Sequence, residues 1–234
     1  MSFYTQFAEY YEEIFSFSTG VASFLERNAS SGSNCLDVGC GTGHYAGFLA
    51  ARERIVMGID LDGAMIAYAK VHYPQVTFLK MDMRDISELG AGFDTIFCIG
   101  NSGAHLPQQD MLAFISSVKA QLNPGGTWIL QLMNWDYVLL QEKVTFPVIH
   151  TRNELTFERS YTQISRESVM FNTRLKHREE LVFKDSVPLY PILSREVQQY
   201  HIKAGFKPVA HYANYAGDAF DPGSFSASIF VFRS

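Results

Sequence analysis

Leu36-Asp37-Val38-Gly39-Cys40-Gly41-Thr42-Gly43 is the stretch that decides the fold of this chain. An apolar run with an acid inside it leads into three glycines that alternate over five residues, and a helical pattern follows. Glycines allow a sharp turn and let a ligand approach the backbone closely. The backbone N–H groups of such a turn and of the helix after it face that ligand. The pattern predicts a buried strand, a tight turn and a helix that together bind a nucleotide-like molecule.

The carboxylate of Asp37 favours a ligand that carries a cationic amino group and no phosphate. A dinucleotide fold is the competing interpretation, because Gly41, Gly43 and Ala46 fit the looser G-x-G-x-x-G/A fingerprint. A strand-to-helix turn without any ligand would use the same glycines. The residues downstream of the turn decide among these alternatives.

The stretch resembles motif I of the class I S-adenosylmethionine-dependent methyltransferases. This resemblance implies S-adenosylmethionine as the cofactor. It also implies that Asp37 and the glycine turn, with Gly39, Gly41 and Gly43, hold the methionine end of that cofactor.

Composition limits the class of protein. The chain has 234 residues, of which 47% are hydrophobic and 18% charged, which suits one globular domain with an insertion. A net charge of −5 without a Lys/Arg cluster argues against a nucleic-acid footprint, and no run of about 18 apolar residues suggests a membrane span. Cys35, Cys40 and Cys98 show neither metal-ligand spacing nor a disulfide pattern, and no basic-plus-apolar signal peptide begins the chain. We therefore expect no metal and a cytoplasmic protein. His201 and His211 look peripheral.

Aromatic residues recur at three- and four-residue steps over the first fifteen residues, which predicts an amphipathic helix, and residues 17–25 continue the pattern in a second one. The string Phe7-Ala8-Glu9-Tyr10-Tyr11-Glu12 resembles the N-terminal segment of many small-molecule methyltransferases. In those relatives the helix closes over the cofactor, which implies that Tyr11 faces the site. Tyr10 and Tyr4 are weaker candidates.

Residues 55–60 read as a second buried strand that ends on an acid, about 17 residues after Gly43. An acid at this position accepts hydrogen bonds from ribose hydroxyls in either nucleotide fold. We expect Asp60, with the adjacent Leu61, to bind the ribose. Asp62 is expected to cap a helix over 63–72.

A third strand over 76–79 is followed by Asp82 and Met83. An acid here resembles the methyltransferase position that accepts a hydrogen bond from the adenine amino group. The resemblance implies that Asp82 binds adenine and that Met83 offers it a backbone N–H and an apolar contact. A surface turn is the alternative for Asp82.

The apolar run 93–99 predicts a central strand, and it leads into Gly100, Asn101 and Ser102. Open α/β sheets bind ligands at the carboxyl ends of their strands. We expect Ile99 and Gly100 to contact the cofactor and Asn101 to lie near the methylated atom. An Asx-turn in which Asn101 serves only its own backbone stays an equal alternative.

Four segments, 98–102, 105–106, 122–126 and 134–139, together resemble the glycine and sarcosine N-methyltransferase group, which shows "GNSxxHL", "PGG" and "NYDxIL" at similar spacing. The resemblance covers roughly residues 36–140. It implies that Asn101 lies at the acceptor, His105 at the methionine end, and Asn134 and Trp135 on the acceptor side. One departure is that residues 12–25 contain no arginine to hold the cofactor carboxylate.

Residues 145–190 do not continue the alternation of strands and helices. Hydrophobic residues recur at every second position in runs over 155–161, 169–175 and 181–183, which predicts a small antiparallel sheet. An insert at this point lies over the strand ends and acts as a lid. Arg174 or Arg159 could meet an acceptor carboxylate bidentately, although a solvated arginine is the alternative for each. Tyr190 at the exit of the insert is expected to face the site.

The fold expected is a Rossmann-like α/β sheet of seven strands in the order 3-2-1-4-5-7-6, with the last strand antiparallel. We expect a cofactor-binding core over 1–144, a β insert over 145–190 and a core completion over 191–234. No catalytic triad is seen, and transfer from a sulfonium needs only alignment and exclusion of water. The sequence therefore predicts a small-molecule methyltransferase that favours N-methylation over O- or C-methylation, in which Tyr11 and Asn101 position the acceptor.

Two other functions stay open. One is a catalytically silent module that binds S-adenosylmethionine or S-adenosylhomocysteine, and the other is a dinucleotide oxidoreductase. The partner expected is a small molecule, with neither nucleic acid nor membrane, and a homodimer is kept as an option.

Overall fold

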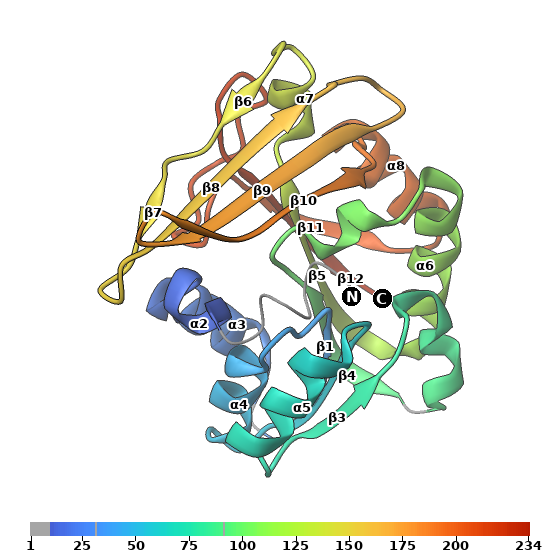
Figure 1. The fold of residues 1–234 in the computed structure, drawn as a ribbon. Coiled ribbons are helices and arrows are strands. Elements are labelled where there is room, and N and C mark those ends of the chain that lie inside the picture. Colours follow the sequence, from blue (N-terminus) through green and yellow to red (C-terminus); the bar gives the residue numbers. More distant parts are fainter. Residues whose placement is uncertain (1–9, 31, 91) are drawn as a thin grey trace.

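Two sheets organise the computed structural model, which describes residues 10–30, 32–90 and 92–234 (Figure 1). The larger sheet has seven strands in the order β11-β12-β5-β4-β1-β2-β3. The smaller one has the order β10-β9-β8-β6, and β7 pairs with β8. The predicted order of the seven-stranded sheet is confirmed.

The large sheet is parallel in its centre, and only β12 runs against its neighbours β5 and β11. Its strands are β1 (Asn34–Val38), β2 (Ile55–Asp60), β3 (Thr77–Lys80), β4 (Phe93–Cys98), β5 (Leu122–Met133), β11 (Lys207–Tyr212) and β12 (Ala227–Arg233). The helices are α2 (Tyr11–Ile14), α3 (Thr19–Asn28), α4 (His44–Ala50), α5 (Gly63–His72), α6 (Gln108–Gln121), α7 (Trp135–Val138) and α8 (Ser194–Lys203). Two 3₁₀ helices cover Met83–Leu89 and Ser102–His105.

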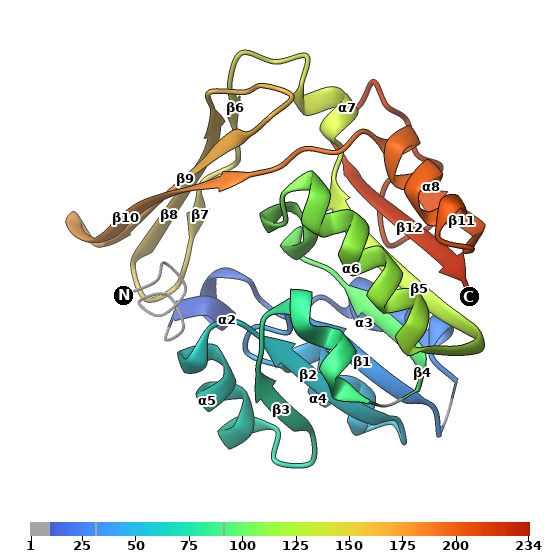
Figure 2. The same ribbon diagram turned by 90° about the vertical axis from the view of Figure 1, so that its right-hand side faces the viewer.

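Helices cover both faces of the large sheet, which explains why its central strands are apolar throughout (Figure 2). On one face, α6 and α8 bury Phe114, Val118 and Val197 in the same core as Trp128 of β5. On the other face, α3, α4 and α5 bury a second core, which includes Phe24, Leu25, Leu49 and Ile66. The two cores lie on the two faces of the sheet, and the carboxyl ends of β1 to β4 line a cavity between the sheet and the insert.

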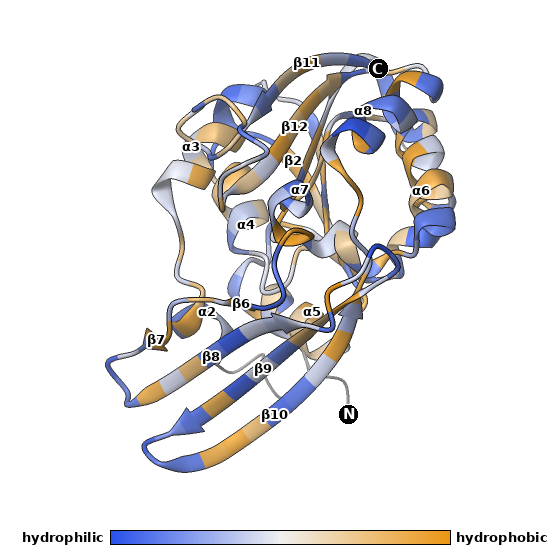
Figure 3. Cartoon of the chain, turned by 90° about the horizontal axis from the view of Figure 1, so that it is seen from above, coloured by the Kyte–Doolittle hydropathy of each residue, from blue (hydrophilic) through white to orange (hydrophobic). Residues whose placement is uncertain are grey.

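The insert begins with β6 (Val144–Thr145) and β7 (Ile149–His150) and continues with β8 (Leu155–Thr162), β9 (Val169–His177) and β10 (Glu180–Leu189). Buried hydrophobic residues alternate with more exposed ones along β8, where Leu155, Phe157 and Tyr161 are buried, as a sheet with one buried face requires (Figure 3). Its apolar face packs on Ile14 of α2 and Met65 of α5. The antiparallel insert therefore spans from the end of β5 across to the helices beside β1 and β2.

Two local features differ from what the sequence indicates. Strand β5 begins at Leu122, so the Pro-Gly-Gly segment at 124–126, a combination typical of turns, belongs to the first part of that strand. Of the first predicted helix, the described residues hold one turn, Tyr11–Ile14, while Tyr4 and Phe7 lie outside the described residues. In the described part of the chain, no helix is long and apolar enough to cross a membrane.

His201, expected at the periphery, is fully buried and joins α8 to the sheet. Its Nε2 accepts a hydrogen bond from the indole N–H of Trp128 at 2.9 Å, and its Nδ1 lies 2.6 Å from the carbonyl oxygen of Val197. The imidazole stacks on Phe232 with ring centroids 4.0 Å apart. His211 is also packed between two rings, those of Phe220 and Phe230.

We expect the free energy of unfolding to fall as the pH is lowered from about 6.5 to about 4. Burial lowers the pKa of His201 from 6.5 to about 4, so the unfolded chain binds more protons than the folded one within this window. Replacing His201 by Phe should reduce the pH dependence. It should also cost about 1–3 kcal/mol at neutral pH, because Trp128 loses its acceptor. Urea denaturation across the pH range measures both effects.

The exposed His177 of β9 supplies the control for stability, since His177→Phe leaves no buried donor without its acceptor. An identical pH dependence in wild type and His201→Phe would contradict the assignment.

Candidate functional site

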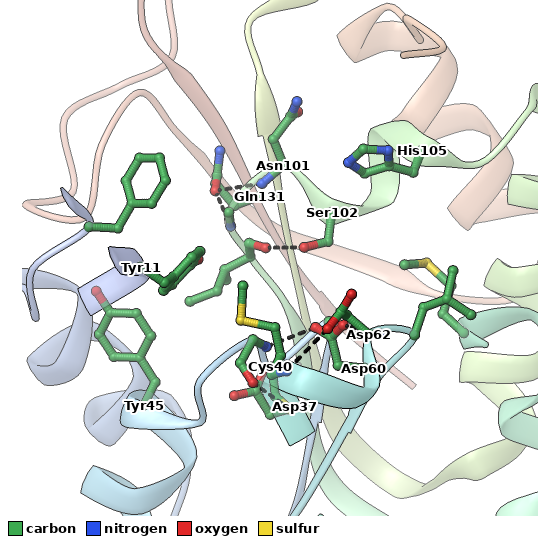
Figure 4. Close-up of a pocket in the computed structure, with 18 of the residues that line it drawn as sticks. Tyr11, Asp37, Cys40, Tyr45, Asp60, Asp62, Asn101, Ser102, His105 and Gln131 are labelled. Atoms are coloured by element: carbon green, nitrogen blue, oxygen red, sulfur yellow. Dashed lines mark hydrogen bonds between the residues drawn. The ribbon is translucent and has the colours of Figure 1, made fainter. Parts of the chain in front are cut away.

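A cavity of about 700 Å³ lies where the carboxyl ends of β1 to β4 meet the insert (Figure 4). Asp37, Asp60 and Asp62 gather on its sheet side, and Asn101 and Gln131 come from the ends of β4 and β5. Helix α2 and aromatic side chains of the insert line the side of the cavity opposite the sheet. The topology thus brings residues from distant parts of the sequence around one enclosed space.

The glycine turn after β1 has three positive backbone φ angles, 73° at Gly39, 54° at Gly41 and 81° at Gly43. A Cβ at Gly39 would stand 2.8 Å from the side chain of Ser102, so the turn can approach the β4 loop only without a side chain. Gly39 and Gly41 line the cavity. Gly43, expected at the cofactor, instead precedes α4 and packs against Phe78, outside the cavity lining.

The carboxylate of Asp60 connects the end of β2 to the glycine turn. One oxygen accepts a hydrogen bond from the Gly41 N–H at 2.8 Å, and the other accepts one from the Asp62 N–H at 2.9 Å. Asp62 caps α5, as predicted, by accepting from the N–H groups of Ala64 and Met65. Asp60 therefore stays at the rim of the cavity, where its remaining lone pairs can meet a ligand.

Asp37 is a buried acid with no hydrogen bond to its carboxylate among the described residues, and it is only 2% exposed. Burial raises its pKa well above the ordinary value, and the neighbouring Asp60 raises it further. Burial likewise raises the pKa of Asp60, although the N–H donors of Asp62 and Gly41 oppose the shift. Two acids on the same wall of the cavity favour a cationic group between them.

Asp82 and Met83 line the cavity beside β3, as do Leu61 and Ile99 at the ends of β2 and β4. Asp82 holds Arg84 through two short contacts, 3.0 Å to Nε and 2.6 Å to Nη2. These hydrogen bonds lower the pKa of Asp82. Its carboxylate is therefore fixed in place as an ionised acceptor.

The loop after β4 is held by β5. Gln131 accepts hydrogen bonds from the N–H groups of Gly100 at 2.7 Å and Asn101 at 3.3 Å. Asn101, at a φ of 66°, accepts one from the N–H of Met133 at 2.9 Å. The side-chain oxygen of Asn101 thus binds the neighbouring strand and not a turn of its own, and its NH₂ group donates to no other residue that the structure describes. The sequence did not single out Gln131, although a polar residue inside an apolar strand was the available signal.

Tyr11 lines the cavity from α2 and lies directly over the glycine turn. Its ring is 3.6 Å from the position that a Cβ at Gly41 would occupy. Tyr45 of α4, missed in the sequence, lines the same wall. His105 lines the far side, and burial lowers its pKa, so its imidazole is neutral near pH 7.

Two of the residues expected on the acceptor side, Asn134 and Trp135, lie elsewhere. Asn134 is fully buried and caps α7, accepting from the Tyr137 N–H, while its NH₂ group donates to the carbonyl oxygens of Asp221 and Ser224. Trp135 is 1% exposed and packs on the ring of Tyr161. Neither residue lines the cavity.

Arg174 and Tyr190 are also outside the cavity lining. Arg174 is exposed on β9, because alternate residues of a strand point to opposite faces and its neighbour Thr173 is buried. Tyr190 follows β10, and its N–H donates to the carbonyl oxygen of Ala104 at 2.7 Å. The insert instead lines the cavity with Arg159 and with aromatic residues that include Phe157 and Tyr161.

We expect Gln131→Met to loosen the β4 loop, because the N–H groups of Gly100 and Asn101 would lose their acceptor inside the protein. The cost should be about 1–3 kcal/mol in the free energy of unfolding. Denaturant titration measures this cost, and hydrogen exchange at Gly100 and Asn101 should become faster. Gln109→Met, on the exposed side of α6, is the matched control and should change neither quantity. Unchanged exchange in Gln131→Met would contradict the holding role.

Comparisons with known proteins find similarity to methyltransferases over part of the chain. Residues 35–126 match the family model described as a methyltransferase domain. The chain is 30% identical over 123 residues to the glycine N-methyltransferase of Mus musculus. It is 31% identical over 112 residues to the dTDP-3-amino-3,6-dideoxy-alpha-D-glucopyranose N,N-dimethyltransferase of Streptomyces fradiae. These matches cover 44% and 47% of this chain, and 41% and 44% of the relatives, so the chain spans less than half the length of either curated relative.

Solved structures share the fold over nearly the whole chain. An S-adenosylmethionine-dependent methyltransferase from Clostridium acetobutylicum matches with a TM-score of 0.81 and 15% identity, over 99% of both chains. CalS10, an amino pentose methyltransferase from Micromonospora echinaspora solved with its cofactor bound, matches with a TM-score of 0.73 and 22% identity, over 100% of this chain and 98% of that one. The expected Rossmann-like methyltransferase fold is confirmed.

Proposed function

We propose that this chain, which carries a methyltransferase domain over residues 35–126 on the class I methyltransferase fold, transfers a methyl group from S-adenosylmethionine to the nitrogen of a small molecule. The observation that carries the proposal is the meeting of Asp37, Asp60, Asp82 and the glycine turn along one wall of a single cavity. These groups stand at the carboxyl ends of three neighbouring parallel strands, in the order in which an extended nucleoside ligand would need them.

The residues present fit such a cofactor. Asp37 is a buried carboxylate without a hydrogen bond among the described residues, and the cationic amino group of a methionine moiety would stabilise its charge. Asp60 would accept from ribose hydroxyls, and Asp82 with Met83 would hold the adenine ring. Tyr11 lies over the glycine turn and covers the methionine end.

The bound cofactor supplies a methyl group on a sulfonium, which is already a good leaving group. The protein therefore has to align the acceptor and exclude water. Tyr11 and the NH₂ group of Asn101 position the acceptor, while the insert over residues 145–190 serves as the substrate lid over the core parts 1–144 and 191–234. An amine must be neutral to attack, and the neutral imidazole of His105 can accept the proton that an ammonium ion would lose.

An amine acceptor is supported by two kinds of relative. The two curated relatives named above are N-methyltransferases, one of glycine and one of an amino sugar nucleotide. The structural neighbours include a sugar N-methyltransferase, KedS8, with a TM-score of 0.72. We therefore favour nitrogen over oxygen or carbon as the methylated atom. Formation of S-adenosylhomocysteine with a panel of small amines tests the activity. Cofactor binding without turnover on any acceptor would favour a catalytically silent binding module.

We expect Asp60→Ala to weaken S-adenosylmethionine binding by about 10- to 100-fold, because the ribose hydroxyls lose a charged acceptor. Isothermal titration calorimetry on wild type and variant measures the change. Asp85→Ala is the matched control, since Asp85 is exposed and lies outside the cavity lining. Thermal unfolding shows whether Asp60→Ala still folds. Lack of binding by folded, ligand-free wild type would refute the proposal.

Cofactor binding should release protons from the protein. Burial and Asp60 hold the pKa of Asp37 high in the free protein, and a cationic amino group beside it would lower that pKa. Affinity should therefore rise as the pH is raised through the titration range of Asp37, with release of up to about one proton per site. Calorimetry in two buffers of different ionisation enthalpy counts the protons.

Asp37→Asn should abolish this proton release and weaken binding, whereas Asp85→Asn should change neither. Equal proton release in wild type and Asp37→Asn would show that another group titrates.

A further inference from the structure

Arg159 of β8 lines the cavity, and no acid among the described residues forms an ion pair with it. Its guanidinium forms no ion pair and no hydrogen bond within the described part of the chain, and its Nε is buried without a partner. Arg84, the other arginine of the lining, is bound to Asp82 and Asp110. Among the described residues, the acids of the cavity lie on the sheet side, and none of them pairs with Arg159.

The surroundings of Arg159 are aromatic. Its Cζ lies 5.0 Å from the ring centroid of Phe146, 5.5 Å from that of Phe15 and 5.7 Å from that of Phe157. Aromatic faces attract the cation, but they offer no acceptor to N–H groups that point outward in the guanidinium plane. A half-buried charge in such surroundings is costly unless an anion accepts those hydrogen bonds. The guanidinium of Arg159 therefore presents N–H donors in a fixed planar arrangement inside the cavity.

We propose that Arg159 binds a carboxylate of the methyl acceptor, so that the substrates of this enzyme are small amines that also carry an anionic carboxylate. The proposal rests on the proposed methyltransferase function and adds the class of acceptor. A planar carboxylate matches the guanidinium fork and can accept two parallel hydrogen bonds. Phe146 and Phe157 exclude water around the pair, which strengthens it.

The position of Arg159 assigns it to the acceptor and not to the cofactor. It belongs to the insert, as do Phe146 and Phe157, whereas the acids and the glycine turn that fit the cofactor belong to the large sheet. A cofactor seated along the sheet would place its methyl group between these two walls. The acceptor would then have its amine toward Asn101 and its carboxylate toward the insert.

A matched pair of variants separates this role from a general effect of charge. Arg159→Gln removes the cation and keeps much of the side-chain length. Arg174→Gln removes the same charge from the neighbouring strand, but from the exposed face. Arg159→Lys keeps the charge and loses the bidentate fork, so it should restore only part of the affinity.

The first measurement needs no turnover. Calorimetry of benzoate, with benzamide as its neutral counterpart, is carried out on protein saturated with S-adenosylhomocysteine. Benzoate should bind wild type and Arg174→Gln equally and should bind Arg159→Gln at least about tenfold more weakly. Benzamide should not distinguish the three proteins. Equal benzoate affinity in wild type and Arg159→Gln, or no benzoate binding to wild type, would overturn the proposal.

The affinity for S-adenosylhomocysteine, measured in the same proteins, keeps the two proposals distinguishable. If wild type does not bind it, the proposed function fails, and the benzoate titration is still made on the protein alone. If Arg159→Gln loses it, Arg159 holds the cofactor carboxylate and the acceptor assignment is wrong. With active protein, kcat/KM for an amino acid should fall on the order of 100-fold in Arg159→Gln, while that for the corresponding amino acid amide should not change.

Discussion

The hydrogen bonds between the glycine turn and the end of β2 are the constraint on which the site depends. The N–H groups of Gly39 and Cys40 both donate to the carbonyl oxygen of Ile59, at 2.8 and 2.9 Å, and the Gly41 N–H donates to the carboxylate of Asp60 at 2.8 Å. A turn with three positive φ angles would otherwise be free to open. Because it is bound to β2, the turn presents its backbone and two acids in one fixed arrangement.

Acidic side chains and an unpaired basic side chain lie on opposite sides of the cavity among the described residues. The sheet side carries Asp37, Asp60 and Asp82, and the insert side carries Arg159. Burial makes the charges of Asp37, Asp60 and Arg159 costly, as the raised pKa values of the two acids and the lowered pKa of Arg159 show. A ligand that carries both a cation and an anion would offset the cost of these separated charges. This polarity is what distinguishes the cavity from an ordinary apolar gap between a sheet and its cover.

The insert is anchored through packing as well as through its connections to the core. Its apolar face buries Leu155, Phe157 and Leu175 against Ile14 of α2 and Met65 of α5. The same strand, β8, that packs against these helices also carries Arg159 into the cavity, because residues two apart share a face. The position of Arg159 is thus coupled to the docking of α2, which carries Tyr11 over the glycine turn.

The sequence by itself determined the strands, the helices beside them and the acids at the strand ends, because these follow from local periodicity and from motifs a few residues long. The methyltransferase fold was recognisable for the same reason. The order of the strands was implied by the resemblance to the methyltransferases. Only the tertiary structure decided the acceptor side. Arg159 and Arg174 look alike in an alternating strand pattern, and the pairing of β8 with β9 decides which one faces the cavity. Asn134 likewise looked like a ligand residue until its amide was seen to cap α7 and bind the loop before β12, a contact between residues about 90 positions apart that no local pattern can show.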